Sequence, residues 1–277
     1  MKYKLVCIDM DGTLLNSKHK ISEETKISLR KAHEKGVHIV ITTGRIYNNA
    51  AYYSNLLGVK SPVIAANGAF IREKDKSDVI YMNTLTENQC RSILDILLKY
   101  KLVPHFHTYN EVYLGSRFHK FMSYIAIGRK LPKDMPVISR YIGNKDKWYN
   151  VFKKMDGNLV KAIVFHPNAN RINKAKEELM KIPSLEIASS GDLNIEINAE
   201  GVCKGQAVEV LAKYYGIKRE EVICIGDNEN DVSMIEYAGL GVAMGNAIES
   251  LKKKANYITD TNDNDGVAKV IEKFILS

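Results

Sequence analysis

Two acidic residues, Asp9 and Asp11, follow directly on the apolar run 5–8, which is typical of a buried strand. Because successive strand side chains point to opposite faces, both carboxylates project the same way, roughly 6.6 Å apart along the chain. Gly12 permits a tight turn after the strand, and Thr13 is able to hydrogen-bond to the backbone beyond it. The motif Asp9-Met10-Asp11-Gly12 predicts two carboxylates in one site, although the same four-residue pattern also occurs as a plain polar turn.

Three further polar motifs lie where an apolar run ends or a helix begins. TTGR at 42–45 closes one apolar run, Lys204 opens a helical pattern, and GDNEND at 226–231 follows another apolar run. In open parallel sheets, ligands bind beyond the carboxyl ends of the strands. We therefore expect these motifs to meet the two N-terminal carboxylates in one crevice.

That crevice would combine carboxylates, a lysine, a hydroxyl and backbone N–H groups, a set that suits phosphoryl transfer assisted by a divalent cation. Carboxylates hold Mg²⁺, while the lysine and the hydroxyl balance and orient the phosphoryl oxygens. One carboxylate is then available to attack phosphorus as a nucleophile. The sequence thus predicts an enzyme with Mg²⁺ as its cofactor.

The two ends of the chain share a pattern in which strands alternate with helices. A length of 277 residues favours two domains, or one domain with a large insertion. The pattern in 1–83 and 193–277 predicts an α/β fold, a Rossmann-like parallel sheet with helices on both faces. Expected strands cover 5–8, 37–42, 62–65, 222–225 and 240–243, and expected helices cover 22–36, 47–57, 204–215, 231–237 and 267–274.

The middle segment 84–192 is richer in Tyr, Lys and Arg and less regular in pattern. We interpret it as an inserted α+β cap, with helices near 87–99 and 172–181 and strands near 112–114 and 161–165. It contains 18 Lys plus Arg and 10 Asp plus Glu, so it carries the whole net charge of +8. This excess favours an anionic partner, or it forms only a solvated basic surface.

Composition also limits the possible partners and the compartment. Hydrophobic residues make up 45% of the chain, and no apolar run reaches the length of a membrane span, so we expect a soluble protein without a membrane partner. Without a visible export signal, the cytoplasm is the expected location. The sequence pI is about 9.1, but no nucleic-acid-binding motif accompanies it. Reduced thiols are expected at all four cysteines, Cys7, Cys90, Cys203 and Cys224.

The ordered motifs DMDGT, TTGR, Lys204 and GDNEND resemble those of the haloacid dehalogenase-like (HAD) hydrolase superfamily, specifically its Cof-type phosphatases. NGA at 67–69 and GLGVAMGNA at 239–247 match as well. The resemblance spans the chain apart from the interior of the cap. It implies a core domain in 1–83 and 193–277, a type IIB cap in 84–192, and Mg²⁺-dependent hydrolysis of small phosphorylated metabolites. Sugar phosphates are the first expectation, with FMN or pyridoxal phosphate also open.

The same resemblance implies the chemical roles of three aspartates. Asp9 would be the nucleophile, forming an aspartyl-phosphate, and also a metal ligand. Asp11 would protonate the leaving oxygen and then activate water, while its backbone carbonyl touches the metal. Asp227 would complete the metal site.

It further implies a phosphate-binding set of Thr43, the N–H of Gly44, Lys204 and Asn230. Lys204 would neutralise the charge that the nucleophile and the phosphate bring together. Asp231 would contact the metal ligands rather than the metal itself, or it would reach the metal through a water molecule.

Two other functions stay open, a phosphosugar mutase or phosphotransferase and a non-enzymatic aspartyl-phosphate switch. The switch is disfavoured because Asp11 would shorten the life of such a signal. The natural substrate and the oligomeric state are not predicted.

Several weaker signals have a structural interpretation beside the functional one. Arg45 could reach a substrate anion or pair with an acidic loop residue. His105 and His107 supply half a metal site at most, and Glu196 and Asn198 either line the cleft or belong to an ordinary strand. Cap residues that could contact substrate, which we do not rank, are Tyr109, Tyr113, Tyr124, Arg117 and Arg129.

Overall fold

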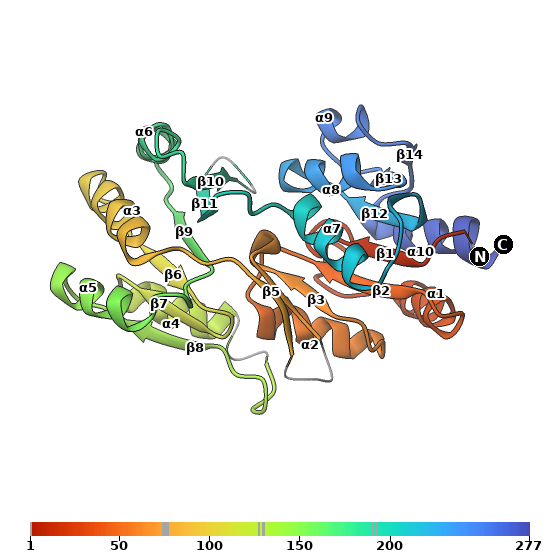
Figure 1. Ribbon diagram of the computed structural model, residues 1–277, viewed down its shortest axis with the longest axis horizontal. Coiled ribbons are helices and arrows are strands. Elements are labelled where there is room, and N and C mark those ends of the chain that lie inside the picture. The colour runs from red at the N-terminus through yellow and green to blue at the C-terminus, as the bar shows by residue number, and fades with distance from the viewer. Residues whose placement is uncertain (1, 74–77, 127, 129–130, 190, 192) are drawn as a thin grey trace. The chain divides into compact units, whose positions relative to one another are not determined.

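The computed structural model describes residues 2–73, 78–126, 128, 131–189, 191 and 193–277. It divides the chain into two compact units, shown in Figure 1. The first unit comprises Met1–Arg45, Tyr53–Tyr81 and Cys203–Ser277, and the second comprises Ile46–Tyr52 and Met82–Val202. Arg129, one of the unranked cap residues, lies outside the described residues.

An eight-stranded sheet forms the centre of the first unit, in the order β14-β13-β12-β1-β2-β3-β4-β5. All neighbours from β14 to β3 are parallel, and β4 runs antiparallel to β3. The strands are β1 (Leu5–Ile8), β2 (His38–Thr42), β3 (Val63–Ala65), β4 (Phe70–Arg72), β5 (Val79–Met82), β12 (Val222–Gly226), β13 (Leu240–Ala243) and β14 (Tyr257–Ile258).

Helices cover both faces of this sheet. They are α1 (Glu23–Glu34), α7 (Lys204–Tyr214), α8 (Val232–Tyr237), α9 (Glu249–Lys252) and α10 (Gly266–Ile271). Helix α2 (Tyr47–Leu57) is divided between the two units, with its residues up to Tyr52 in the second. The connections β1–α1–β2 and β12–α8–β13 run to opposite sides of β1, so right-handed crossovers place α1 and α8 on opposite faces. α10 packs against α1, and α7 packs against α8, as Figure 1 shows. The predicted fold class is confirmed.

The central strands bring the polar motifs to one edge of the sheet. β1 lies between β12 and β2, with Cys7 paired to Cys224 in register. Every residue of β1 and β12 is buried, as expected for a parallel sheet covered on both faces. Asp9, Thr43 and Asp227 therefore all lie at or just beyond the carboxyl ends of adjacent strands.

The second unit contains a six-stranded sheet in the order β10-β11-β9-β6-β7-β8. Its neighbours are antiparallel except for β7 and β8. Its strands are β6 (His105–His107), β7 (Glu111–Leu114), β8 (Ile138–Tyr141), β9 (Lys161–Phe165), β10 (Leu185–Ala188) and β11 (Asn194–Ala199), and its helices are α3 (Glu87–Lys99), α4 (Arg117–Ala126), α5 (Lys145–Lys154) and α6 (Ala169–Leu179).

The helices of the second unit divide between the two faces of its sheet. α3 packs against α5 and α6, and Phe106 on β6 contacts Trp148 and Phe152 of α5. His105, next to Phe106 on the strand, instead contacts His119 of α4. Because neighbouring strand residues point to opposite faces, α4 lies on the face opposite α5.

Most predicted elements coincide with observed ones within two residues, and the deviations occur at helix ends. The helix expected at 267–274 ends at Ile271 and continues as a π-helical turn, Glu272–Leu276. All four cysteines are free thiols. Among the described residues, no helix combines the length and the apolar character needed to cross a membrane.

Candidate active site

The turn that follows β1 carries the two N-terminal carboxylates. Asp9 is buried at 6% exposure, whereas the side chain of Asp11 is 51% exposed. The N–H groups of Leu14 and Leu15 donate to the carbonyls of Asp9 and Met10, at 3.1 and 2.8 Å, and close the turn. Thus only one of the two predicted partners lies deep in the site.

Gly12 is required in this turn for two reasons. Its φ of +83° is a conformation that side chains rarely tolerate, and a Cβ there would lie 2.4 Å from Oδ2 of Asp227. On the same side, the Thr13 hydroxyl donates to Oδ1 of Asp227 at 2.7 Å. The β1 turn and the loop after β12 are therefore locked together.

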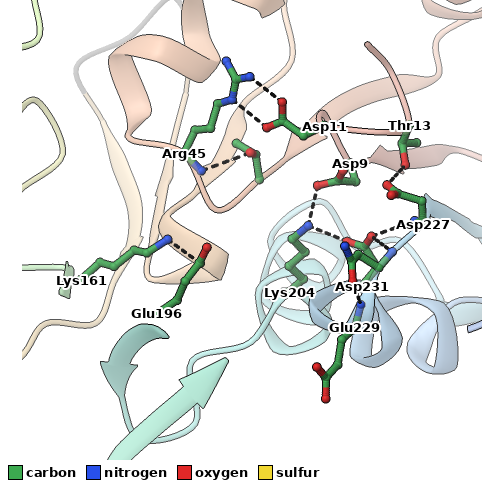
Figure 2. Close-up of polar contacts among 12 residues, drawn as sticks. Asp9, Asp11, Thr13, Arg45, Lys161, Glu196, Lys204, Asp227, Glu229 and Asp231 are labelled. Atoms are coloured by element: carbon green, nitrogen blue, oxygen red, sulfur yellow. Dashed lines mark hydrogen bonds and ion pairs between the residues drawn. The ribbon is translucent and has the colours of Figure 1, made fainter. Parts of the chain in front are cut away.

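Lys204 lies at the centre of the buried part of the site. It is the first residue of α7, and its ammonium donates to Oδ1 of Asp9 at 2.6 Å and to Oδ1 of Asp231 at 2.5 Å (Figure 2). The ammonium group and the Asp231 carboxylate are fully buried. The predicted lysine thus bridges the predicted nucleophile to GDNEND.

Asp231 uses both oxygens to hold this arrangement. Its Oδ2 accepts hydrogen bonds from the N–H groups of Asp227 and Asn228, at 2.9 and 3.0 Å, while Oδ1 accepts from Lys204. A Cβ on Gly226 would lie 2.6 Å from Cβ of Asp231, so glycine is needed where the loop folds back. Asp231 is therefore committed to Lys204 and the loop.

Burial changes the protonation equilibria of this cluster. It raises the pKa of Asp9 well above its usual value, which Lys204 opposes and Asp231 reinforces. It also raises the pKa of Asp227 to about 6, against the effect of the Thr13 hydrogen bond. Burial disfavours the charged form of Lys204, but Asp231 and Asp9 outweigh it and raise the lysine pKa.

The carboxylates meet a simple test for a divalent cation. Asp9, Asp227 and Asp231 each offer an oxygen, and these oxygens lie within 4.8 Å of one another. Both oxygens of Asp231 are already hydrogen-bonded, whereas Oδ2 of Asp9 and Oδ2 of Asp227 accept no hydrogen bond from the described residues. Three carboxylates against one ammonium leave excess negative charge, and such hard oxygen donors suit Mg²⁺ or a similar ion.

The remaining predicted site residues lie around this cluster with fewer contacts. Thr43 is buried after β2, and its hydroxyl accepts from the N–H of Arg45 at 3.1 Å, across Gly44. Asn230 lies in the short 3-10 helix before α8, and its side chain makes no hydrogen bond among the described residues. The structure thus groups Asp9, Lys204, Asp227 and Asp231, and leaves Thr43, Gly44 and Asn230 near strand ends.

Arg45 pairs with Asp11 through two hydrogen bonds, Nε to Oδ2 at 2.7 Å and Nη2 to Oδ1 at 2.5 Å (Figure 2). Of the two interpretations of Arg45, the structure therefore contains the acidic loop partner. Burial disfavours charge on the guanidinium, but the hydrogen bonds that it donates to Asp11 raise the Arg45 pKa above its usual value.

The weaker signals other than Arg45 lie in the second unit. His105 contacts His119, and among the described residues no group of potential metal ligands includes a histidine. Glu196 accepts from Lys161 at 2.5 Å in a buried ion pair, and the Asn198 amide donates to the carbonyl of Val160. The other cap residues are more exposed or engaged locally: Tyr113 donates to Glu111, Arg117 lies over the ring of Tyr141, and Tyr124 is exposed on α4.

Two residues that the sequence interpretation did not single out contact the β1 turn. The Asn246 amide donates to the carbonyl of Gly12 at 2.8 Å, and the Asn262 amide donates to the carbonyl of Leu15 at 2.9 Å. Asn246 belongs to the run GLGVAMGNA, which was noted only as a whole.

Comparisons with known proteins show which proteins this chain resembles. The haloacid dehalogenase-like hydrolase family profile matches residues 6–271. The chain is 33% identical to a 5-amino-6-(5-phospho-D-ribitylamino)uracil phosphatase of Bacillus subtilis, over 99% of this chain and 96% of the relative.

Among solved structures, it resembles a haloacid dehalogenase-like hydrolase from B. subtilis with a TM-score of 0.84 and 30% identity, covering 99% and 100% of the two chains. A HAD subclass IIB sugar phosphatase gives a TM-score of 0.80 at 26% identity, covering 98% of each chain.

Proposed function

The chain belongs to the haloacid dehalogenase-like hydrolase family and is a phosphatase, and from this premise we propose that it hydrolyses small phosphorylated metabolites with Mg²⁺ through an aspartyl-phosphate on Asp9. The observation that carries the proposal is the buried cluster in which Lys204 bridges Asp9 and Asp231 beside Asp227. A buried cluster of carboxylates around one ammonium, with its excess of negative charge, is suited to a cation and to the phosphoryl group that this cation neutralises.

Asp9 and Asp227 would hold the metal through the oxygens that their neighbours leave available, with the backbone carbonyl of Asp11 as a third ligand. When bound, the ion supplies positive charge that favours the anion of Asp9 and neutralises phosphoryl oxygens. The raised pKa values of Asp9 and Asp227 support this need for a cation.

The protein's own groups then divide the reaction into two displacements. In the first, a carboxylate oxygen of Asp9 forms a bond to phosphorus as the ester oxygen leaves, and Asp11 gives that oxygen its proton. In the second, Asp11 takes a proton from water as the water oxygen bonds to phosphorus and the bond to Asp9 breaks. The products are the alcohol and inorganic phosphate, and both aspartates return to their starting states.

The other predicted residues would hold the transferring group. Lys204 neutralises the charge that Asp9 and the phosphoryl group bring together. The Thr43 hydroxyl, the Gly44 N–H and the Asn230 amide donate to the phosphoryl oxygens. Asp231 keeps Lys204 and the loop that carries Asp227 in place.

We propose that residues 84–192 act as the cap and recognise the leaving group. The buried pair of Lys161 and Glu196 offers a charged donor and a charged acceptor on the face of the second unit's sheet that also carries His107. Hydroxyl-rich molecules match such groups. One relative is named for a phosphoribityl compound and one solved structure for a sugar phosphatase, which supports a sugar or sugar-alcohol phosphate as the substrate.

A panel of phosphorylated metabolites, assayed with Mg²⁺ for release of inorganic phosphate, tests the function. We expect turnover that EDTA abolishes and added Mg²⁺ restores. An isomeric sugar phosphate formed in place of inorganic phosphate would indicate a mutase.

Two variants test the covalent step. Asp9→Asn should abolish turnover, and Asp11→Asn should trap or greatly slow the phosphoenzyme, which intact-protein mass spectrometry detects. Glu249→Gln, at an exposed carboxylate paired with Lys252, is the control. Turnover by Asp9→Asn, once conversion of the new amide to acid is excluded by mass, would contradict the proposal.

A further inference from the structure

The turn Asp9–Leu15 is anchored by two asparagine side chains that come from distant parts of the sequence. The Asn246 amide donates to the carbonyl of Gly12 at 2.8 Å, and its Oδ1 accepts from the N–H of Asn262 at 3.0 Å. The Asn262 amide in turn donates to the carbonyl of Leu15 at 2.9 Å. Three hydrogen bonds thus form a continuous bridge from Gly12 to Leu15.

The loops that carry these asparagines are themselves fixed. Asn246 follows β13, where the N–H of Gly245 donates to the carbonyl of Asp260 at 3.0 Å. A Cβ on Gly245 would lie 3.0 Å from the backbone of Asp260, so the two loops pack backbone to backbone. Asn246 is therefore presented to the β1 turn from a rigid support.

On its other side, the β1 turn lies against Asp227. The Thr13 hydroxyl donates to this carboxylate, and Gly12 leaves no room for a side chain there. Asp11 directly precedes these fixed residues. Its backbone carbonyl accepts no hydrogen bond from the described residues, although Asp9, Met10, Gly12 and Leu15 all have bonded carbonyls.

We propose that Asn246, held by Asn262, is a positioning residue that sets the orientation of the turn carrying Asp11. This inference rests on the proposed function, in which the Asp11 carbonyl contacts the metal and its carboxylate moves protons. The Leu15 N–H holds the carbonyl of Met10 before Asp11, and Asn246 holds the carbonyl of Gly12 after it, so the chain is fixed on both sides of Asp11. Asn246 itself touches neither substrate nor metal.

An amide is suited to this position because one side chain must donate to Gly12 and accept from Asn262. Aspartate has nearly the same shape and keeps the acceptor, but it places an oxygen against the Gly12 carbonyl. Asn246→Asp is therefore a nearly isosteric removal of one hydrogen bond.

The matched control is Asn256→Asp. The Asn256 Oδ1 accepts from the N–H of Gly241 at 2.8 Å, and aspartate preserves this contact while adding the same charge in the same unit. Both variants are compared with the wild type in Mg²⁺-dependent hydrolysis of p-nitrophenyl phosphate. The rise in melting temperature on adding Mg²⁺ gives a second readout that does not depend on turnover.

For Asn246→Asp we expect kcat to fall about tenfold, because small displacements of catalytic groups are costly. The Mg²⁺ concentration for half-maximal activity should rise, the Mg²⁺-induced thermal shift should shrink, and KM for the ester should change less than twofold. Asn262→Asp should act in the same direction, and the double variant should be no worse than the more impaired single variant, because both residues belong to one bridge.

Wild-type turnover together with equal kcat and equal Mg²⁺ response in Asn246→Asp and Asn256→Asp would overturn the inference. If wild type hydrolyses no ester, the proposed function fails, and the Mg²⁺-induced thermal shift alone decides the positioning role. Should Asn246→Asp not fold, Asn246→Ala replaces it with the same expected loss and the same criterion for rejection.

Discussion

Arg45 donates two parallel hydrogen bonds to Asp11, so both oxygens of this carboxylate face the guanidinium. The pair is partly exposed, with 27% of the arginine side chain and 51% of the aspartate side chain accessible. Ion pairs this exposed contribute only about 0–1 kcal/mol to stability. We therefore expect the Arg45–Asp11 pair to orient the Asp11 side chain rather than to stabilise the fold.

Arg45→Met should lower kcat about tenfold while leaving the melting temperature within a few degrees of wild type, because Asp11 loses its orienting partner. The kcat of Arg45→Lys should lie between those of wild type and Arg45→Met, since an ammonium cannot donate the two parallel hydrogen bonds of a guanidinium. Steady-state kinetics and thermal unfolding measure both effects. Arg140→Met is the control, because Arg140 makes the same two-bond contact with Glu111 in the second unit. Wild-type kcat in Arg45→Met would contradict this role.

Lys204→Met should be the most damaging lysine substitution in the chain. It leaves Asp9 and Asp231 buried without their cation, and breaking such a pair costs about 3–5 kcal/mol. Urea unfolding followed by circular dichroism should show this loss, and Mg²⁺ should restore part of it. Lys213→Met, in the same helix but at a solvent-exposed pair with Glu209, should unfold like wild type. A stable and active Lys204→Met protein would refute the charge-balance argument.

Gly12→Ala separates backbone strain from steric conflict. Gly12 and Gly36 have nearly the same φ, +83° and +89°, but a Cβ at Gly36 meets nothing within 4 Å, whereas one at Gly12 meets Asp227. Both alanine variants should lose about 1–2 kcal/mol from the unfavourable φ. Only Gly12→Ala should also lose turnover, by about 100-fold or more, and its Mg²⁺-induced thermal shift. Comparable activity of the two variants would mean that the contact with Asp227 is dispensable.

The parts of the fold that could be predicted are those in which local pattern and burial agree. The residues of β1 and β13 match the expected ranges, because a buried parallel strand is uniformly apolar and is bounded by turn residues. Helix α2 also matches its expected range, 47–57. Ser22, the first residue of the helix expected at 22–36, is the N-cap of α1 and accepts from the N–H of Thr25. The elements that were not predicted are strands β4, β5, β8, β10 and β14 and helices α4, α5 and α9. These strands have two to four residues and, unlike β1, are not buried along their whole length, so they lack a continuous apolar run.

The sequence predicted which residues meet in the site better than it predicted the hydrogen bonds between them. Strand ends in a parallel sheet converge for topological reasons, so Asp9 and Asp227 could be expected together. That Asp231 holds Lys204 with one oxygen and the loop with the other depends on side-chain conformations that spacing does not fix. The bridge from Asn246 to Gly12 joins residues 234 apart, and a lone asparagine in a loop gives no local sign of such a contact.

Three histidines of the second unit are placed so that protonation opposes folding. His105 Nε2 lies 2.8 Å from His119 Nδ1, and Nε2 of His107 is buried without a hydrogen-bond partner among the described residues. Burial first, and then the nearby His119, lower the pKa of His105 to about 3. Burial, Lys161 and His105 lower the pKa of His107, and burial lowers that of His119.

The second unit should therefore lose stability as the pH falls below about 6.5, where histidines of the unfolded chain take up protons but His105 and His107 in the folded chain do not. His105 contributes a slope of about 1.4 kcal/mol per pH unit, or about 2 kcal/mol between pH 6.5 and 5, and His107 acts in the same direction. Trp148, the only tryptophan in the sequence, packs against Phe106, the residue between His105 and His107 in β6. Its fluorescence in urea therefore reports the unfolding of the second unit. His107→Gln should flatten the dependence, whereas His19→Asn, at an exposed histidine of the first unit, should leave it unchanged. A pH-independent urea midpoint for wild type between pH 7.5 and 5 would show that these histidines are not held neutral.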